Sequence, residues 1–549
     1  MEYQITLERC NMRIDQFYSD IDKNNFYLGM VSQVYKDGCV IQVENLSWLQ
    51  QRRINQELLI PNTINYYVII DSIQGLFIGE VYQAKIQSAQ NTHYAVQNNS
   101  TEKVFPELFV DLIGVLPPDG DSFNTPGFYS VGLLDRVYLT NRRINKKYLE
   151  SIELSRLDDD YWQERLSSFA TATDLGDEAI TLYPESLFDR HLMAIGTTNS
   201  GKSTSSLSIL DKLVQGMKKI LIIDPTGEYA ESFHEKSVQK LTLGVDTTLD
   251  PGQVSFTQWA TLFEANDSSQ PAVLADAIRS LRLQKKRNSD EVLVKRGEYV
   301  STIISLLKTL EDDDLSFNLK LLPKQIIEEA VQVANSRYVS NDFQFNNKQW
   351  LVQKVRYKLD NDKLIDFFSS DPSKVDLLSE LNDFMNNKTG SLYINTSIIG
   401  IGEAVGAMII DLISNYIVNK KKKNNIAFVL FIDEVHRYAR DARSGGFQTG
   451  LTSIAREGRK KGIFMFLTSQ NPNDVPEELL GQIGTLLIHR LTHRRELEAV
   501  RNYVSDSSYK QIPKLNQGEA ILTSINLLKD LHLCVTKCTR KHFNRTMNL

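Results

Sequence analysis

Residues 191–210, HLMAIGTTNSGKSTSSLSIL, decide the fold. An apolar run ends at Ile195, the segment Gly196–Ser203 matches G-x4-G-K-[ST] in full, and a helical pattern follows, which is the context that this motif requires. The glycines let consecutive backbone N–H groups point at phosphate oxygens, Lys202 neutralises those oxygens, and Ser203 can bind Mg²⁺. The motif predicts an ATP-binding loop that consists of Gly196, Thr197, Thr198, Asn199, Ser200, Gly201, Lys202, Ser203 and Thr204.

A second apolar strand pattern, Phe428–Ile432, ends in the two acids Asp433 and Glu434. A continuous apolar run is typical of a strand buried in a parallel sheet, and ligands bind at the carboxyl ends of such strands. We expect Asp433 to hold Mg²⁺ and Glu434 to activate a water molecule. The second acid favours ATP hydrolysis over simple ATP binding.

Three more residues are candidates for completing a hydrolytic site. Arg456 and Arg459 lie in AREGRKKGI, and Gln470 ends the next apolar strand pattern. Phosphoryl transfer concentrates negative charge, so a cation aimed at the γ-phosphate, often from a neighbouring subunit, completes catalysis. The arginines are therefore either arginine fingers or the basic end of a surface helix. Gln470 is either a γ-phosphate sensor or a hydrogen-bonding group at the end of a sheet.

The rest of the chain divides by pattern. Short alternating apolar runs separated by turn signals predict a small β-barrel at residues 1–155. Alternating strands and helices predict an α/β core at 156–254 and 391–510, and residues at helical spacing predict a helical insertion at 255–390. The last core strand and a C-terminal segment are expected at 511–549.

Composition excludes several classes of protein. With 549 residues, 42% hydrophobic and 24% charged, the chain is neither disordered nor a disulfide scaffold. The longest apolar run, Ile426–Ile432, is far shorter than the ~20 residues of a membrane-spanning helix. The start MEYQITLERC has no signal or transit features, so we expect a cytoplasmic protein that does not bind membranes. A net charge of −6 excludes a simple polycation but allows a basic channel inside an acidic exterior.

Two motif matches lack the context that they need. Asp433–His436 spells the DEVH box of two-lobed helicases, but too little chain follows it for a second nucleotide-binding lobe. Ser444–Gln448 is similar to a transporter-ATPase signature, yet it follows the acid pair instead of preceding it. We expect a flexible loop there.

Other spacings favour structural roles. Cys534 and Cys538 have no second Cys or His pair at zinc-site spacing, and His489 and His493 span the expected end of a strand. We therefore expect no structural metal. The lysines at 420–423 fit the solvated end of a helix. No nuclease or deaminase constellation is present in the sequence.

Taken together, the motifs resemble the HerA-type hexameric DNA translocases, relatives of FtsK. The resemblance rests on Gly196–Thr204, Asp224–Tyr229 (DPTGEY), Phe431–Tyr438 (FIDEVHRY), Ala455–Ile463 (AREGRKKGI), Thr468–Pro472 (TSQNP) and Leu515–Ala520 (LNQGEA). It implies an α/β RecA-like P-loop ATPase core with an N-terminal small β-barrel and an inserted helical bundle. By position, Arg459 matches the family's arginine finger best and Arg456 second, and Glu228 matches a family acid near the nucleotide. The C-terminal segment matches a tail that braces the adjacent subunit.

The same resemblance implies a homohexamer that moves double-stranded DNA on ATP hydrolysis, with an effector protein on the barrel side. An Asn-rich composition indicates a mesophilic, bacterial member, whose effector is expected to be a nuclease or sirtuin-like protein in anti-phage defence or DNA end processing. The basic residues are candidate DNA contacts or solvated faces, at Arg282, Lys285, Lys286, Arg287, Arg494 and Arg495. The alternative is an ATP-gated oligomeric scaffold that regulates an effector without net DNA translocation.

Overall fold

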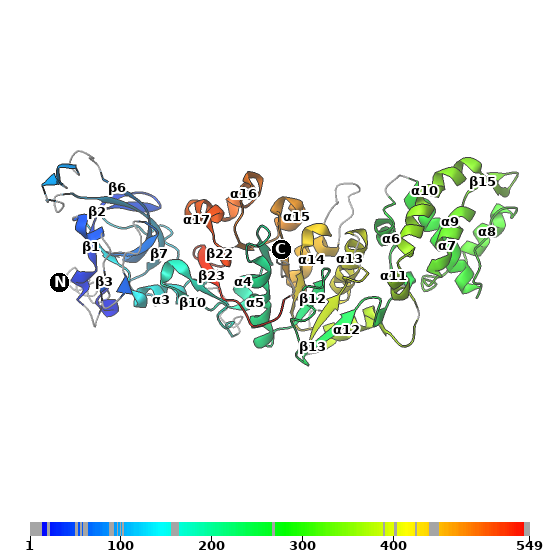
Figure 1. The fold of residues 1–549 in the computed structure, drawn as a ribbon, viewed down its shortest axis with the longest axis horizontal. Helices are drawn as coiled ribbons and strands as arrows, with labels where there is room; N and C mark the ends of the chain where they lie inside the picture. Colours follow the sequence, from blue (N-terminus) through cyan, green and yellow to red (C-terminus); the bar gives the residue numbers. More distant parts are fainter. Residues whose placement is uncertain are drawn as a thin grey trace, which may run out of the picture. The chain divides into compact units, whose positions relative to one another are not determined.

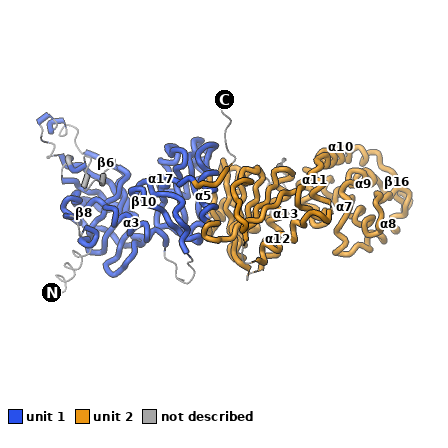
Figure 2. Tube along the Cα trace, turned by 60° about the horizontal axis from the view of Figure 1, so that its bottom comes forward, with its two compact units in different colours: residues 1–187, 196–212, 484–537 blue, residues 188–195, 213–483, 538–549 orange. Residues whose placement is uncertain are grey.

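The computed structural model describes residues 14–18, 22–44, 46–49, 53–54, 57–58, 64–86, 93–95, 97–98, 100, 104–154, 164–265, 269–369, 371–387, 390–399, 403–422, 425–438 and 450–542. Contacts divide the chain into two compact units (Figure 2), residues 1–187, 196–212 and 484–537 in unit 1 and residues 188–195, 213–483 and 538–549 in unit 2. These units follow packing, and the domain boundaries expected from the sequence remain a proposed division.

A closed antiparallel barrel forms the N-terminal part of unit 1 (Figure 1). Its order is β1-β2-β7-β6-β5-β8, with bounds Tyr27–Val34 (β1), Gly38–Val43 (β2), Tyr66–Ser72 (β5), Gly75–Lys85 (β6), Glu107–Leu116 (β7) and Arg136–Leu139 (β8). Apolar side chains such as Val31, Ile69 and Phe77 are fully buried, and closure leaves no unpaired strand edge. The small barrel expected from the sequence is confirmed.

Five further strands of unit 1 form antiparallel pairs in the order β10-β9-β23-β22-β21. Their bounds are Ala170–Ala172 (β9), Glu178–Ile180 (β10), Thr485–Ile488 (β21), Glu519–Ser524 (β22) and Leu531–Val535 (β23). Strand β22 therefore has a partner on each side, and its residues Ala520, Ile521 and Leu522 are fully buried.

Unit 2 contains a parallel sheet of order β11-β20-β19-β12-β18-β13. The bounds are Leu192–Ile195 (β11), Ile220–Asp224 (β12), Val238–Thr242 (β13), Ser391–Asn395 (β18), Phe428–Ile432 (β19) and Ile463–Ser469 (β20). Helix α13 (Glu403–Lys420) packs on α14 (Gly450–Lys461), and α14 packs on β20. One strand, β20, thus separates the strand before the G-x4-G-K-S loop from the strand before the acids. This is the RecA-like P-loop core that the sequence predicts.

A helical bundle interrupts this core (green in Figure 1). Its helices are α6 (Phe256–Leu262), α7 (Gln270–Lys286), α8 (Val300–Leu307), α9 (Leu322–Glu328), α10 (Asp342–Leu359), α11 (Asp362–Phe367) and α12 (Leu377–Asn386). The fully buried Trp259 ring lies 5.6, 5.9 and 5.0 Å from the rings of Phe263, Phe317 and Phe368. The inserted bundle expected from the sequence is confirmed.

The insertion also contains a hairpin that the helical pattern did not predict. Strands β15 (Val331–Ala334) and β16 (Arg337–Ser340) pair around Asn335 and Ser336, whose φ values are 50° and 61°. Two left-handed residues between valine- and tyrosine-containing runs make the two-residue turn that joins antiparallel strands. Within the ranges described, no helix is long and apolar enough to cross a membrane.

Candidate nucleotide-binding site

The G-x4-G-K-S segment turns sharply between β11 and helix α5 (Lys202–Gln215). Asn199 and Gly201 have φ values of 64° and 104°, a backbone shape that lets successive N–H groups form an anion-binding concavity. Lys202 is buried and begins α5, so Ser203 lies in the first turn of a helix of 14 residues. The positive end of that helix favours phosphate.

The end of β21 supports the first half of this loop. The backbone N–H and the hydroxyl of Thr197 both donate to the carbonyl oxygen of Arg490, at 3.2 and 3.1 Å. His489 is fully buried beside the loop, and a Cβ atom on Gly196 would lie 2.6 Å from the Cβ atom of His489. Burial lowers the pKa of His489 to about 4, so its ring is neutral at pH 7. Its Nδ1 lies 3.0 Å from the carbonyl oxygen of Glu519.

The turn before β22 supports the second half. The N–H of Gly518 donates to the carbonyl oxygen of Ser200 at 3.1 Å, and the side-chain amide of Gln517 donates to Asn199 Oδ1 at 2.9 Å. A Cβ atom on Gly201 would lie 2.8 Å from the backbone nitrogen of Gly518. Only glycine at position 201 permits this approach of one backbone to the other.

The acid pair after β19 has its own hydrogen-bonded support. Thr468 at the end of β20 donates its hydroxyl proton to Asp433 Oδ1 and accepts from the N–H of Glu434 at 2.8 Å. Gln470 Nε2 donates to Glu434 Oε1 at 3.1 Å, and His436 Nδ1 lies 3.2 Å from Glu434 Oε2. Glu434 has a left-handed backbone with φ 49°, a conformation that non-glycine residues adopt at a cost and chiefly at functional positions.

Asp224, at the end of β12, organises the loop DPTGEY. The carboxylate is fully buried. Its Oδ1 accepts from the N–H and the hydroxyl of Thr226 and from the N–H of Gly227, at 3.1, 3.0 and 2.8 Å. Its Oδ2 accepts from the N–H of Tyr229 and the hydroxyl of Tyr393, at 2.9 and 2.8 Å. This structural role was not predictable from the residues of the motif alone.

The same loop brings further acids together. Burial and the carboxylates of Asp433, Asp224, Glu228 and Glu434 raise the pKa of the fully buried Tyr229. Glu228 Oε2 lies 3.3 Å from His542 Nε2. The described part of the C-terminal segment therefore contacts its own chain.

Both arginine-finger candidates form ion pairs within the chain. Arg459 Nε lies 3.0 Å from Asp189 Oδ1, and the Arg459 side chain is 51% exposed whereas Asp189 is buried. Arg456 pairs with Glu478 at 3.2 Å, and both of these side chains are exposed. Arg459 therefore keeps accessible surface although it already contacts a buried acid.

One lysine of the run at 420–423 contradicts the expected solvated helix end. Lys421 is buried, its Nζ donates to the carbonyl oxygen of Asn425 at 2.9 Å, and burial lowers its pKa to about 8. A charge count could not show this, because the chain after α13 folds over that side chain.

Three candidate DNA contacts already have partners in the chain. Arg282 lies 5.0 Å above the Phe256 ring, Lys286 pairs with Asp314 at 2.6 Å, and Arg494 pairs with Glu498 at 2.8 Å. In the part of the chain that is described, no group of three or more His, Cys, Asp or Glu is arranged for a metal, and Cys39 and Cys534 are free thiols. Ser444–Gln448 lies outside the described residues.

The residues present fit a magnesium nucleotide. The loop has the concave backbone that phosphates need, Ser203 supplies a hydroxyl at a helix start, and Asp433 supplies a buried carboxylate. Strands β11, β20 and β19 run parallel, so Ile195, Ser469 and Ile432 end at one edge of the sheet. The residues that follow them in the chain are Gly196, Gln470 and Asp433.

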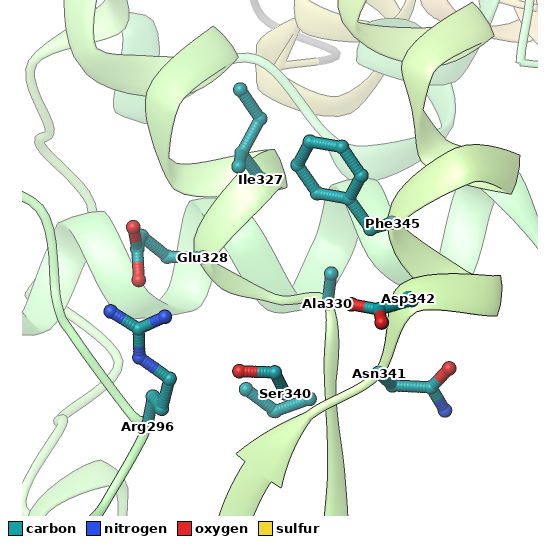
Figure 3. Close-up of a pocket in the computed structure, with 9 residues that line it drawn as sticks. Arg296, Ile327, Glu328, Ala330, Ser340, Asn341, Asp342 and Phe345 are labelled. Atoms are coloured by element: carbon teal, nitrogen blue, oxygen red, sulfur yellow. The ribbon is translucent and has the colours of Figure 1, made fainter.

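A pocket in the insertion offers a different environment. It is lined by Arg296 and by residues of α9, of the β15–β16 hairpin and of the start of α10. Figure 3 shows the Arg296 guanidinium and the Glu328 carboxylate pointing toward one another at one side of the pocket. None of the predicted site residues lines this pocket.

Two models of known protein families match the part of the chain that contains the α/β core. The model of the family described as "Helicase HerA, central domain" matches residues 173–420, and "Helicase HerA-like C-terminal" matches residues 417–528. Similar proteins include "Probable helicase MJ1565" of Methanocaldococcus jannaschii, 22% identical over 351 residues, which are 63% of this chain and 62% of that protein. The "DNA double-strand break repair helicase HerA" of Sulfurisphaera tokodaii is 22% identical over 346 residues, 61% of this chain and 62% of that protein. The chain thus matches less than two thirds of the length of these two relatives.

Among solved structures, VirB4 of Thermoanaerobacter pseudethanolicus is similar with a TM-score of 0.48 at 13% identity, covering 70% of this chain and 99% of that one. The plasmid coupling protein TrwB in complex with a non-hydrolysable GTP analogue has a TM-score of 0.47 at 14% identity, covering 72% and 95%.

Proposed function

The chain belongs to the HerA helicase family, and from that premise we propose that it is an ATP-driven, homohexameric translocase of double-stranded DNA. The observation that carries this proposal is the common edge at which β11, β20 and β19 end, directly before Gly196, Gln470 and Asp433. A phosphate loop, a polar sensor and an acid pair at one sheet edge are the parts that ATP hydrolysis requires.

Binding of ATP uses the loop 196–204. Its backbone N–H groups and Lys202 hold the phosphates, and Ser203 and Asp433 hold Mg²⁺. Held by Ser203 and Asp433, Mg²⁺ would supply positive charge that neutralises the phosphates. Thr468 keeps the Asp433 carboxylate in place, because its hydroxyl donates to Oδ1.

Glu434 is the proposed general base. It accepts a proton from the attacking water, and this needs a carboxylate of fixed direction. Gln470 on one carboxylate oxygen and His436 beside the other provide that direction. Gln470 also links the base to β20, the neighbour of the phosphate-loop strand, so it is suited to sense the γ-phosphate.

Arg459 is the proposed finger for the ATP of a neighbouring subunit, with Arg456 as the second choice. To reach that nucleotide, Arg459 exchanges its contact with Asp189 for one with the γ-phosphate. Glu228 is proposed to lie near the nucleotide.

We further propose that an effector protein, a nuclease or a sirtuin-like enzyme, docks on the barrel and acts in anti-phage defence or DNA end processing. The β1–β2 turn, the β5–β6 turn and the β7–β8 loop meet at one end of the barrel, as the strand registers require. Large apolar side chains exposed there are Tyr35, Ile73, Phe128, Tyr129, Leu133 and Leu134. A group of this kind is typical of a protein contact surface.

Steady-state ATP hydrolysis with and without linear double-stranded DNA tests the proposal. A motor couples the two, so we expect DNA to stimulate hydrolysis by the wild type and Lys202→Ala to abolish hydrolysis. Hydrolysis that is indifferent to DNA would contradict translocation and support the ATP-gated scaffold. The matched variant Glu434→Gln should bind ATP but turn it over ~10²–10⁴-fold more slowly. If that variant still activated an effector, the motor would again be contradicted.

A further inference from the structure

The β22–β23 hairpin runs through unit 1 from the phosphate loop to the barrel. Ile521 of β22 pairs with His532 of β23 on one side and with Ile488 of β21 on the other. The six residues of β22 rise by ~20 Å. Strand β22 is therefore paired on both edges, and its centre is buried.

The Gln517 end of the hairpin contacts the phosphate loop directly. The Gln517 amide bonds to Asn199 Oδ1, and the Gly518 N–H bonds to the carbonyl oxygen of Ser200. The carbonyl oxygen of Gly518 in turn accepts from the N–H of Val535 on β23, at 2.9 Å. The loop is thus tied to both strands of the hairpin.

The opposite end is anchored in the barrel. Lys529, in the turn between β22 and β23, forms an ion pair with Glu80 of β6. Glu80 is 4% exposed. The Lys529 ammonium also lies 5.2 Å from the centre of the Tyr67 ring, whose hydroxyl donates to Asp174 at 2.6 Å. The Lys529 ammonium is thus held by two side chains of the barrel, Glu80 and Tyr67.

We propose that this hairpin couples the barrel to the phosphate loop, with Gln517 as the positioning residue at the loop and Lys529 as the anchor in the barrel. The inference rests on the proposed function and deepens it, because it provides a route by which a protein bound to the barrel changes the affinity for ATP. Neither Gln517 nor Lys529 is assigned any contact with the nucleotide.

The left-handed backbone of Asn199 makes the loop sensitive to this contact. A non-glycine residue leaves that region readily when its side chain loses its partner. The N–H groups of the loop then no longer point the same way, and ATP binding weakens. Loss of one hydrogen bond between neutral groups corresponds to a change in affinity of about three- to tenfold.

Two variants test the two ends. Gln517→Ala should raise KM for ATP about three- to tenfold while kcat stays within about twofold. Replacing the barrel pair by neutral residues of similar size, Glu80→Gln with Lys529→Met, should raise KM in the same direction, and this double change buries no unpaired charge. Matched controls are Gln482→Ala and Lys510→Met, both exposed and outside the hairpin, which should leave KM unchanged.

Amide hydrogen exchange of residues 196–203 in the nucleotide-free protein separates local coupling from a general loss of stability. A general loss would accelerate exchange throughout the protein and not only in this loop. We expect faster exchange there in both test variants and wild-type exchange in the controls. Combining all three substitutions should give less than the sum of the separate effects, because they act on one connection. The swapped pair Glu80→Lys with Lys529→Glu should restore KM towards the wild-type value.

The coupling is overturned if the barrel-pair variant retains wild-type KM and wild-type exchange at 196–203, even when Gln517→Ala has an effect. It is also overturned if the swapped pair is as defective as the neutral pair. Because exchange requires no turnover, a wild type that fails to hydrolyse ATP refutes the proposed function and leaves the coupling testable.

Discussion

Asp224→Asn should loosen the DPTGEY loop by an amount that can be worked out from its contacts. The carboxylate accepts from Thr226 twice and from Gly227, Tyr229 and Tyr393 once each. An asparagine that keeps its oxygen on the Oδ1 side retains the first three of these bonds. The Tyr393 hydroxyl can rotate to accept from the new amide, but the N–H of Tyr229 then faces another donor.

The magnitude follows from these changes. Hydrogen bonds to a charged group contribute roughly 1.5–3 kcal/mol and neutral ones about 1 kcal/mol, so four weakened bonds cost about 2–8 kcal/mol. The unsatisfied N–H of Tyr229 adds roughly 1–3 kcal/mol. The smaller desolvation cost of a buried amide offsets part of this sum, and we expect a net loss of about 4 kcal/mol.

Amide hydrogen exchange at residues 226–229 measures this loss where it occurs. A cost of about 4 kcal/mol corresponds to exchange about 10³-fold faster, if the loop opens locally. The control is Asp246→Asn, because Asp246 is exposed and accepts one bond, from the N–H of Thr242 at 2.7 Å. An acceleration of less than about tenfold in Asp224→Asn, or an equal one in the control, would refute the reasoning.

Three more predictions concern the site. Burial lowers the pKa of His489 to about 4, so the contribution of its neutral ring to stability is complete above about pH 6.5 and is lost towards pH 4, at up to about 1.4 kcal/mol per pH unit. In urea unfolding at pH 7 and pH 5, His489→Asn should therefore lose less stability on acidification than the wild type. An equal loss contradicts this prediction. Arg459→Ala removes the ion pair between Arg459 and the buried Asp189 carboxylate, so the free energy of unfolding should fall by about 1–2 kcal/mol and the thermal unfolding midpoint with it. The double change with Asp189→Asn should recover most of this loss, and no recovery means that the pair does not stabilise the fold. Gln470→Ala should lower kcat about ten- to a hundredfold with KM for ATP within about twofold, since it removes the amide that donates to Glu434 Oε1. A rise in KM at unchanged kcat in the same kinetics would assign Gln470 to ATP binding instead.

Local pattern was sufficient for the elements that carry their own signal. The strand before Gly196, the strand before Asp433 and the barrel were all predictable, because apolar runs and turn residues report on neighbours within a few positions. The hairpin β15–β16 was missed, since its short strands lie among residues at helical spacing.

The supports of the site could not be read from the sequence. His489 and Gln517 reach the phosphate loop from the far end of the chain, and no spacing rule connects them to Gly196 or Asn199. Lys421 looked like part of a solvated run until the fold placed a backbone carbonyl beside it. The roles assigned to the loop, the acids and the arginines remain predictions that the variants above test.

The long insertion within the core has a consequence for how the protein is made. Ile222 of β12 aligns with Tyr393 of β18 and with Phe431 of β19. The first pairing partner of β12 therefore leaves the ribosome about 170 residues later, and the second about 210 residues later. At translation rates of 5–20 residues per second, this strand waits for roughly ten to thirty seconds. All five of its residues are buried in the finished sheet, and until then they are an apolar segment without a partner. Early truncation or slow codons within 255–390 therefore favour aggregation of the nascent chain.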